Sequence, residues 1–370
     1  MLAQSSASIR AFEARVGGIF ALYCEVAAFH NQACFKFLTE EKSLILRFTV
    51  WLPKVLLLGL ALLGSTFSVA QNYPDKVVHV ITPFPPGGAA DVVLRLVTQK
   101  LGEAFKSTFI VENRVGAGGA VGTQYVARAE PDGYTLLITS SSTMSINPHL
   151  MAKPLYNPLT SFTPIVLVGS SPNVLVVNAK LPIKSVADLV AAAKASPGVL
   201  NYASNGSGTL SHLTGELFKQ TTGVDLLHIP YKGAAPAVAD TAGGQVTALF
   251  AAYASVSPML KSGRLRPLGV TSLKRLDLAP EFPTLAESGL PGFESNQWWG
   301  LYGPAGMPAP IVARLNAEVN KILSSPELRK RFAEEAIDVG GGSPADLSNY
   351  LRQDYAKWEK VVKRGNIKSE

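Results

Sequence analysis

An apolar strand, a glycine turn and a helix follow one another twice in this chain, and this order most constrains its fold. In the first case the apolar run 77–82 leads through 83–91 (PFPPGGAAD) into a run of helical spacing from Ala89 to Phe105. In the second case 202–213 (YASNGSGTLSHL) passes from an apolar segment through glycines into another helical run. This alternation predicts an α/β fold with largely parallel strands and helices on both faces of the sheet.

Both glycine turns suit the binding of an acid. Gly87 and Gly88 in the first turn, and Gly206 and Gly208 in the second, allow positive φ angles and close approach of a ligand. The free N–H groups at the start of the following helix carry partial positive charge. A carboxylate could be held by these groups alone, and two such turns facing one another suit a molecule with two acidic ends. The alternative is that the glycines only make tight turns.

Polar side chains accompany the second turn. Ser204, Ser207 and Thr209 add hydroxyl groups, and His212 lies one helical turn after Thr209, on a face that can turn toward the same point. Each has a structural alternative. Ser207 and Thr209 suit simple N-capping of the helix, and His212 suits a half-buried, hydrogen-bonded core position.

Residues 1–70 are interpreted as a leader that contains a secretory signal peptide. Lys54 precedes the apolar run 55–64, which is too short to span a bilayer comfortably. Ser68 and Ala70 provide the small residues that an A-x-A cleavage rule requires. We therefore expect cleavage near Ala70 and a periplasmic location; a transmembrane anchor is the alternative.

Composition after residue 70 excludes several kinds of site. Cys24 and Cys34 both precede the predicted cleavage point, which excludes disulfides, cysteine zinc sites and a cysteine nucleophile from the remaining chain. The histidines form no metal-binding pair, so no metal is expected. Residues 1–70 contain six of the 34 Lys and Arg and four of the 27 Asp and Glu, which leaves a net charge of about +5. Without a basic block, this mild charge gives no support to nucleic-acid binding and is compatible with small acids.

The length of the remaining chain predicts two lobes. We expect the first lobe to begin with 71–170, the second to comprise 171–295, and 296–370 to complete the first with three C-terminal helices. The runs 165–169 and 174–178 are predicted as separate strands divided by Ser170, Ser171 and Pro172, and 295–310 as the return crossing. Two crossings leave a cleft between the lobes, which is a common place for a small ligand.

Two enzyme or cofactor motifs are incomplete. The glycine-rich stretch 113–122 has Val121 where a GxGxxG motif that starts at Gly116 needs its third glycine. No GxSxG motif is present, so the nucleophile turn of an α/β hydrolase is missing. We therefore expect no cofactor and no catalytic residue; a secreted hydrolase that uses Ser207 and His212 is an alternative.

The ordered motifs resemble those of the periplasmic solute-binding proteins of the tripartite tricarboxylate transporter type, the Bug family. They are PFPPGGAAD, ENRVGAGGAVGTQYVARAEPDGYTLL, SNGSGTLSHL, HIPYKGAAPAVADTAGGQV, FPTLAESGLPGFES and WWGLYGPAGMPAP, which together span the chain after residue 70. The resemblance implies a type II periplasmic-binding-protein-like fold, with two mostly parallel sheets, helices on both faces and an inter-lobe cleft. It also implies a receptor rather than an enzyme, which captures a small organic acid, a carboxylate or dicarboxylate, for membrane permease subunits. We expect a monomer; a ligand receptor that contacts a membrane sensor is the alternative.

The resemblance also implies that the two glycine loops and the turn at Tyr231 face the ligand. The complete expected set of ligand-binding residues is Phe84, Pro86, Gly87, Gly88, Asp91, Ser140, Ser204, Gly206, Ser207, Gly208, Thr209, His212, Tyr231 and Tyr253.

The expected ligand carries no cationic group. Family members often have an acidic residue at the strand end where this chain has Ala252 and Tyr253. The difference argues against an amino acid and favours an acid with an apolar or aromatic body. Trp298, Trp299 and Tyr302 could form an aromatic wall for such a body, but we expect at least one Trp to pack in the hinge core instead.

Overall fold

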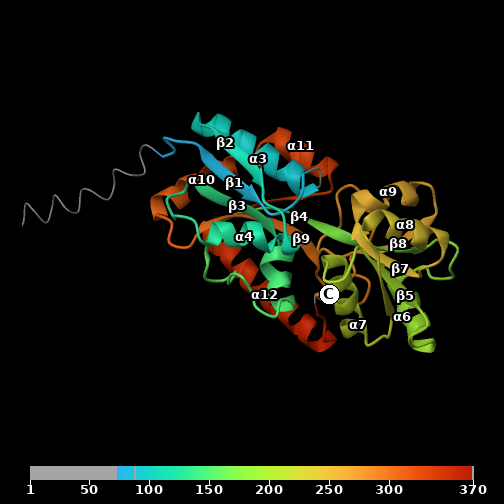
Figure 1. Ribbon diagram of the computed structural model, residues 1–370. Coiled ribbons are helices and arrows are strands. Elements are labelled where there is room, and N and C mark those ends of the chain that lie inside the picture. Colours follow the sequence, from blue (N-terminus) through green and yellow to red (C-terminus); the bar gives the residue numbers. More distant parts are fainter. Residues whose placement is uncertain (1–72, 87–88, 369–370) are drawn as a thin grey trace, which may run out of the picture. The chain divides into compact units, whose positions relative to one another are not determined.

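The computed structural model describes residues 73–368 except 87 and 88 (Figure 1). Contacts group Tyr73–Glu370 as one compact unit. The predicted leader, its cleavage point near Ala70, and the first pair of glycines, Gly87 and Gly88, lie outside the described residues. Within the described part of the chain, no helix is both long enough and apolar enough to cross a lipid bilayer.

Ten strands form a mixed sheet that runs through the middle of this unit. They are β1 (Val78–Thr82), β2 (Phe109–Asn113), β3 (Thr135–Ser140), β4 (Phe162–Asn178), β5 (Asn201–Ser204), β6 (Leu227–Pro230), β7 (Ala248–Ala252), β8 (Leu265–Val270), β9 (Asn296–Pro304) and β10 (Asp338–Gly341). The strand order is β2-β1-β3-β9-β4-β7-β5-β6, and β8 and β10 pair with β4.

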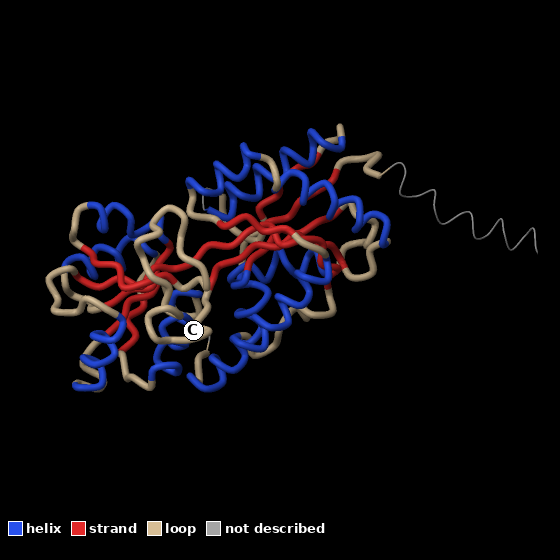
Figure 2. Tube along the Cα trace, turned by 180° about the vertical axis from the view of Figure 1, so that it is seen from behind, coloured by secondary structure: helices blue, strands red, loops and turns tan. Residues whose placement is uncertain are grey.

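Helices cover both faces of this sheet, as Figure 2 shows. They are α3 (Ala89–Phe105), α4 (Ala120–Ala127), α5 (Asn147–Leu150), α6 (Val186–Ala195), α7 (Leu210–Thr222), α8 (Ala234–Gly243), α9 (Tyr253–Lys261), α10 (Ala309–Leu323), α11 (Pro326–Glu334) and α12 (Pro344–Gly365), with the 3₁₀ helix η1 (Ala117–Gly119) and the π-helix η2 (Ser142–Ile146). Side-chain hydroxyls define several helix starts: Thr209 caps α7, and Ser343 and Asp346 form a reciprocal capping box on α12.

We use the name first lobe for β1, β2, β3, β9, β10 and the first half of β4, and the name second lobe for β5–β8 and the second half of β4. The predicted α/β class is confirmed, and the strand–helix alternation gives the parallel pairs β1–β2, β1–β3, β5–β6 and β5–β7. Antiparallel pairs, which the alternation does not predict, each involve β4 or β9.

The predicted break in β4 is wrong, because Ser170, Ser171 and Pro172 lie inside one strand of 17 residues. Pro172 is opposite Asn296 of β9, and the next residue is opposite Ala252 of β7. Proline lacks the N–H that a strand ladder needs. It is accommodated because β4 changes its partner at this point.

The aromatic residues of β9 pack in the core and do not form a wall for the ligand. Trp298, Trp299 and Tyr302 are at most 4% exposed and pack in the apolar core of the first lobe. Strand β9 lies between β3 and β4 with helices on both of its faces, and these three aromatic side chains are enclosed there. Both tryptophans are therefore structural.

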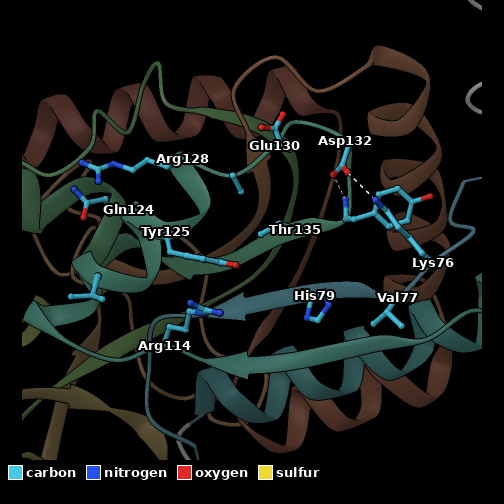
Figure 3. Close-up of a pocket in the computed structure, with 13 residues that line it drawn as sticks. Lys76, Val77, His79, Arg114, Gln124, Tyr125, Arg128, Glu130, Asp132 and Thr135 are labelled. Atoms are coloured by element: carbon cyan, nitrogen blue, oxygen red, sulfur yellow. Dashed lines mark hydrogen bonds and ion pairs between the residues drawn. The ribbon is translucent and has the colours of Figure 1, made fainter.

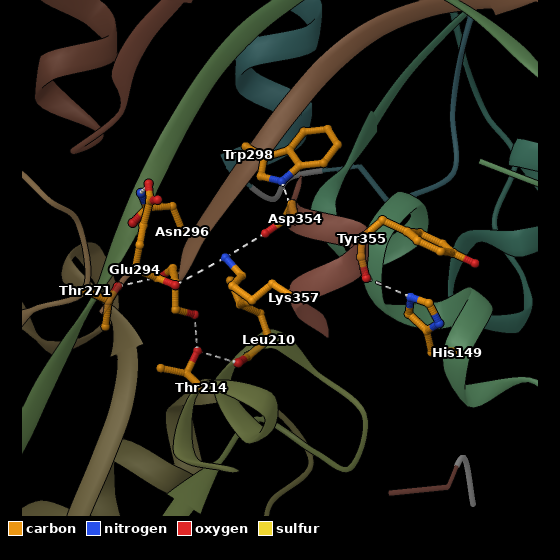
Figure 4. Close-up of polar contacts among 11 residues, drawn as sticks. His149, Leu210, Thr214, Thr271, Glu294, Asn296, Trp298, Asp354, Tyr355 and Lys357 are labelled. Atoms are coloured by element: carbon orange, nitrogen blue, oxygen red, sulfur yellow. Dashed lines mark hydrogen bonds and ion pairs between the residues drawn. The ribbon is translucent and has the colours of Figure 1, made fainter. Parts of the chain in front are cut away.

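Helix α12 connects the two lobes through polar contacts (Figure 4). The buried carboxylate of Asp354 accepts a hydrogen bond of 2.8 Å from Trp298 Nε1 and lies 2.8 Å from Lys357 Nζ. Lys357 also donates to the carbonyl of Glu294, on the return crossing. Further along the same helix, the carbonyl of Val361 accepts from Gln220 of α7. Helix α12 thus fixes the crossing strand and the second-lobe helix together.

Helix α7 can carry no side chain at Gly215. A Cβ atom there would lie 2.0 Å from Cε2 of Tyr202, whose ring is fully buried and whose hydroxyl donates to Glu216 at 2.8 Å. We expect Gly215→Ala to lower the free energy of unfolding by about 1–3 kcal/mol, because the ring and the helix must separate. In contrast, Gly243→Ala in α8 meets no atom within 4 Å and should be neutral or stabilising by up to about 1 kcal/mol. Urea denaturation of both variants measures the difference; equal stabilities would contradict it.

Candidate functional site

The loop between β5 and α7 has the conformation that its glycines predict. Gly206 has φ 134° and Gly208 has φ 75°, and residues other than glycine rarely adopt these values. The hydroxyl of Thr209 donates to the Gly206 carbonyl at 2.7 Å and accepts from the backbone N–H of His212. Thr209 is therefore the N-cap of α7, as its structural alternative predicted, and it fixes the direction in which the positive end of the helix points.

His212 stabilises this loop through a hydrogen bond to its backbone. Its Nδ1 accepts a hydrogen bond of 3.0 Å from the N–H of Gly208, so the neutral ring carries its proton on Nε2. The ring stacks on His228 of β6 with 3.8 Å between the centroids. His228 Nε2 in turn lies 2.6 Å from Oγ of Ser204. Both histidines and Ser204 thus form a polar support for the turn at Gly208, in which His212 and Ser204 are buried and His228 is half-buried.

Burial lowers the pKa of His212 to about 4, and the positive charge of Lys219 acts in the same direction. The ring is therefore neutral at pH 7, and its Nδ1 is free to accept from Gly208. A protonated ring would have to give up that hydrogen bond.

Acidification should destabilise the protein through His212. The unfolded ring has a pKa near 6.5, so between about pH 6.5 and pH 4 the unfolded chain binds a proton that the folded chain does not. The free energy of unfolding should fall across this interval by up to about 3 kcal/mol from this residue. Denaturant titrations from pH 7 to pH 4 measure the fall, and His212→Asn serves as the control, because its Oδ1 can accept from Gly208 but does not titrate. Parallel pH profiles of the two proteins would contradict this role of His212.

In the described part of the first loop, the carboxylate of Asp91 forms hydrogen bonds with neighbouring side chains of the first lobe. Asp91, in the first turn of α3, is 6% exposed and lies 2.8 Å from Nε of Arg95. The amide of Asn113 donates to the carbonyl of Phe84 at 2.8 Å and to Asp91 at 3.4 Å. Pro86 is exposed beside them. Phe84 and Asp91 are therefore brought together, and Asp91 is engaged within the first lobe.

The remaining predicted residues lie at other strand ends. Ser140, at the end of β3, is fully buried, and its Oγ has no hydrogen-bond partner among the described residues. Tyr231 donates from its hydroxyl to Asp240 at 2.8 Å, and burial together with this acceptor raises its pKa to about 12. Its backbone N–H donates to the Ser204 carbonyl, which joins the Tyr231 turn to the loop before α7. Tyr253 packs against Phe282 in the second lobe.

A cavity of about 500 Å³ lies between the lobes at the second loop. Its lining is Ala117, Gly118, Asn147, Leu150, Met151, Ser207 and Gly208. Two predicted residues, Ser207 and Gly208, therefore form one wall, and the other wall comes from η1, α5 and the residue after α5. The walls touch where Gly208 faces Leu150: a Cβ atom on Gly208 would lie 3.0 Å from Cδ1 of that leucine.

The first-lobe wall and His228 were both missed by the sequence analysis. The wall had one usable signal, since Asn147 followed by Pro148 is typical of a helix start. His228 had none, because it meets His212 only through the pairing of β6 with β5.

A second cavity, of about 790 Å³, lies on the first lobe beside α4 and the starts of β1 and β3 (Figure 3). None of the described residues of the predicted set lines it. Lys76 pairs with Asp132 at 3.3 Å, and Arg114 pairs with Glu112 at 3.0 Å while its guanidinium lies over the ring of Tyr125. Arg128 also lines this cavity, and no ion pair joins it to a described carboxylate. The cavity is nevertheless a weaker candidate than the one between the lobes, because neither glycine loop reaches its described lining.

Several known proteins are similar to this chain in sequence and in structure. The model of the tripartite tricarboxylate transporter family receptor matches residues 93–367. Protein BugT of Bordetella pertussis is 36% identical over 300 residues, which cover 81% of this chain and 92% of that protein. The structure of R. palustris Rpa4515 with adipate has 37% identity and a TM-score of 0.69, covering 80% of this chain and 99% of that one. MatC from Rhodopseudomonas palustris with bound malate has 31% identity and a TM-score of 0.65, covering 78% of this chain and 100% of that one.

Proposed function

The chain belongs to the tripartite tricarboxylate transporter receptor family, and on this premise we propose that it captures a small organic acid in the cavity between its lobes. Proteins of this family bind solutes and are not enzymes, and structural neighbours hold adipate and malate. A catalytic role for Ser207 and His212 therefore has no support from its relatives.

The size of the cavity and the loop at one of its walls are what support acid binding. A volume of about 500 Å³ lies within the range of about 300–1,000 Å³ that is usual for small-ligand sites. The loop at Ser207 and Gly208 brings the N-terminal end of α7, which carries partial positive charge, to one wall. Because His212 and Thr209 fix this loop in advance, little ordering cost remains when an acid binds.

We propose two roles for the residues that were predicted to bind the ligand: some contact the acid, and others hold the loop in position. Ser207 and Gly208, which line the cavity, contact the acid, whereas Ser204, Thr209 and His212, which are not among its lining residues, position the loop through their hydrogen bonds. Asp91 positions the first loop through Arg95 and Asn113. We also propose that the chain passes into the second lobe near residue 170 and returns to the first lobe near residue 295.

The proposal extends to the setting of the receptor. Receptors of this family act outside the cytoplasm, and we propose that this chain is exported to the periplasm, cleaved near Ala70, and remains a monomer. Its closed form would deliver the acid to the membrane permease subunits of a tripartite transporter. N-terminal sequencing of the exported protein tests the cleavage point, and a first residue well before or after Gln71 would contradict it.

A thermal-shift screen tests the binding function. Monocarboxylates, dicarboxylates, aromatic acids and amino acids are each added to the purified protein. A ligand at 100 times its dissociation constant stabilises the native state by about 2.7 kcal/mol, which raises the melting temperature by several degrees. We expect a shift from at least one acid and none from amino acids, because Ala252 and Tyr253 offer no carboxylate to an ammonium group. A shift from amino acids alone would contradict this.

A further inference from the structure

The wall that the first lobe contributes to the cavity is uncharged. Ala117 and Gly118 come from η1, Asn147 and Leu150 from α5, and Met151 follows directly. Across the cavity stand Ser207 and Gly208. Within this described lining, no side chain is a Lys, Arg, His, Asp or Glu.

This wall is also fixed in place. The side-chain amide of Asn147 donates to the carbonyl of Gly118 at 2.7 Å, which joins α5 to η1 and engages one of its two N–H donors. Leu150 is 9% exposed and packs with Leu210 of α7 and Trp358 of α12. The wall therefore offers Leu150 and Met151 as apolar surface, and its polar groups are confined to Asn147 and the backbone of η1.

Resting on the proposed function, we infer that this wall receives the uncharged body of the ligand and makes the receptor select long acids over short diacids. A carboxylate placed against Leu150 and Met151 would lose water without gaining a partner, which is unfavourable. A hydrocarbon chain placed there gains by leaving water. The cavity has space for more than about ten water molecules, so a short diacid would leave much of it filled with water.

Calorimetric titration of the purified protein with straight-chain monocarboxylates of increasing length tests this inference. The affinity should rise about four-fold with each methylene group that enters the cavity. Malate and other short diacids should bind more weakly than the best monocarboxylate. Affinity that stays level or falls with length, while acids do bind, overturns this inference and leaves the proposed function standing. If no carboxylic acid binds, the proposed function itself is overturned.

Met151→Lys locates the effect in the wall. Met151 is half-buried and lines the cavity, so a lysine there should weaken binding of the best monocarboxylate about ten-fold and strengthen binding of diacids. Val199→Lys is the matched control, because Val199 is 69% exposed on the second lobe and does not line the cavity, yet the added charge is the same. Unchanged melting temperatures show that both variants are folded. The same affinities in both variants would overturn the inference.

Discussion

Asp354→Ala should lower the free energy of unfolding by about 3 kcal/mol. The substitution leaves the buried N–H of Trp298 without its acceptor and removes the carboxylate that lies 2.8 Å from Lys357 Nζ. Losing one partner of a buried ion pair typically costs about 3–5 kcal/mol, and the lower figure applies because Lys357 is 30% exposed. Equilibrium denaturation in urea measures the loss.

Two further variants test the physical cause. Asp354→Asn retains an acceptor for Trp298 and loses only the charge beside Lys357, so it should cost clearly less than the alanine variant. Glu359→Ala removes the partner of Lys363 in an exposed pair of the same helix, and its cost should be clearly smaller than that of Asp354→Ala. A loss at Asp354 no greater than that at Glu359 would show that burial of this contact does not matter.

Gly208→Val should weaken acid binding about 10- to 100-fold. Gly208 has φ 75°, a conformation that a β-branched residue avoids, and its Cβ would lie 3.0 Å from Leu150. The loop must then move away from the first-lobe wall, and the acid loses hydrogen bonds that are worth about 1.5–3 kcal/mol when one partner is charged. Calorimetric titration with the best acid from the thermal-shift screen measures the loss.

Gly223→Val separates the effect on the site from the effect on the backbone. Gly223 ends α7 with φ 69°, a similar conformation, but a side chain there meets no atom within 4 Å. The variant should lose about 1–2 kcal/mol of stability and keep its affinity. If both valine variants lose the same affinity, the loop at Gly208 has no special role in binding.

Local patterns were sufficient to predict much of the fold. Apolar periodicity predicted α3 and the parallel strands of each lobe, and the hydroxyl of Thr209 predicted the start of α7. These features depend on residues a few positions apart. The break predicted in β4 failed because the partners of a strand decide whether a proline is tolerated, and β4 gains new partners at Pro172.

One part of the candidate site was likewise predictable from local sequence patterns, and the other part was not. The turn at Gly206 and Gly208 was predictable, because positive φ angles favour glycine and helix N-caps favour hydroxyl residues. The opposite wall at Leu150 and Met151 was not, because it faces the turn only after α5, α7 and α12 pack together. Core packing of a Trp was expected, but the buried partner of Trp298 was not, because Asp354 lies far along the chain.

The crystal structure of the protein with its tightest-binding carboxylic acid tests the account most directly. We predict electron density for one acid in the cavity between the lobes, with carboxylate oxygens about 3 Å from donors of the loop at Ser207 and Gly208. Its uncharged body should lie along Leu150 and Met151. An acid bound instead beside Lys76 and Arg114 in the first-lobe cavity, with the space between the lobes holding only water, would contradict the account.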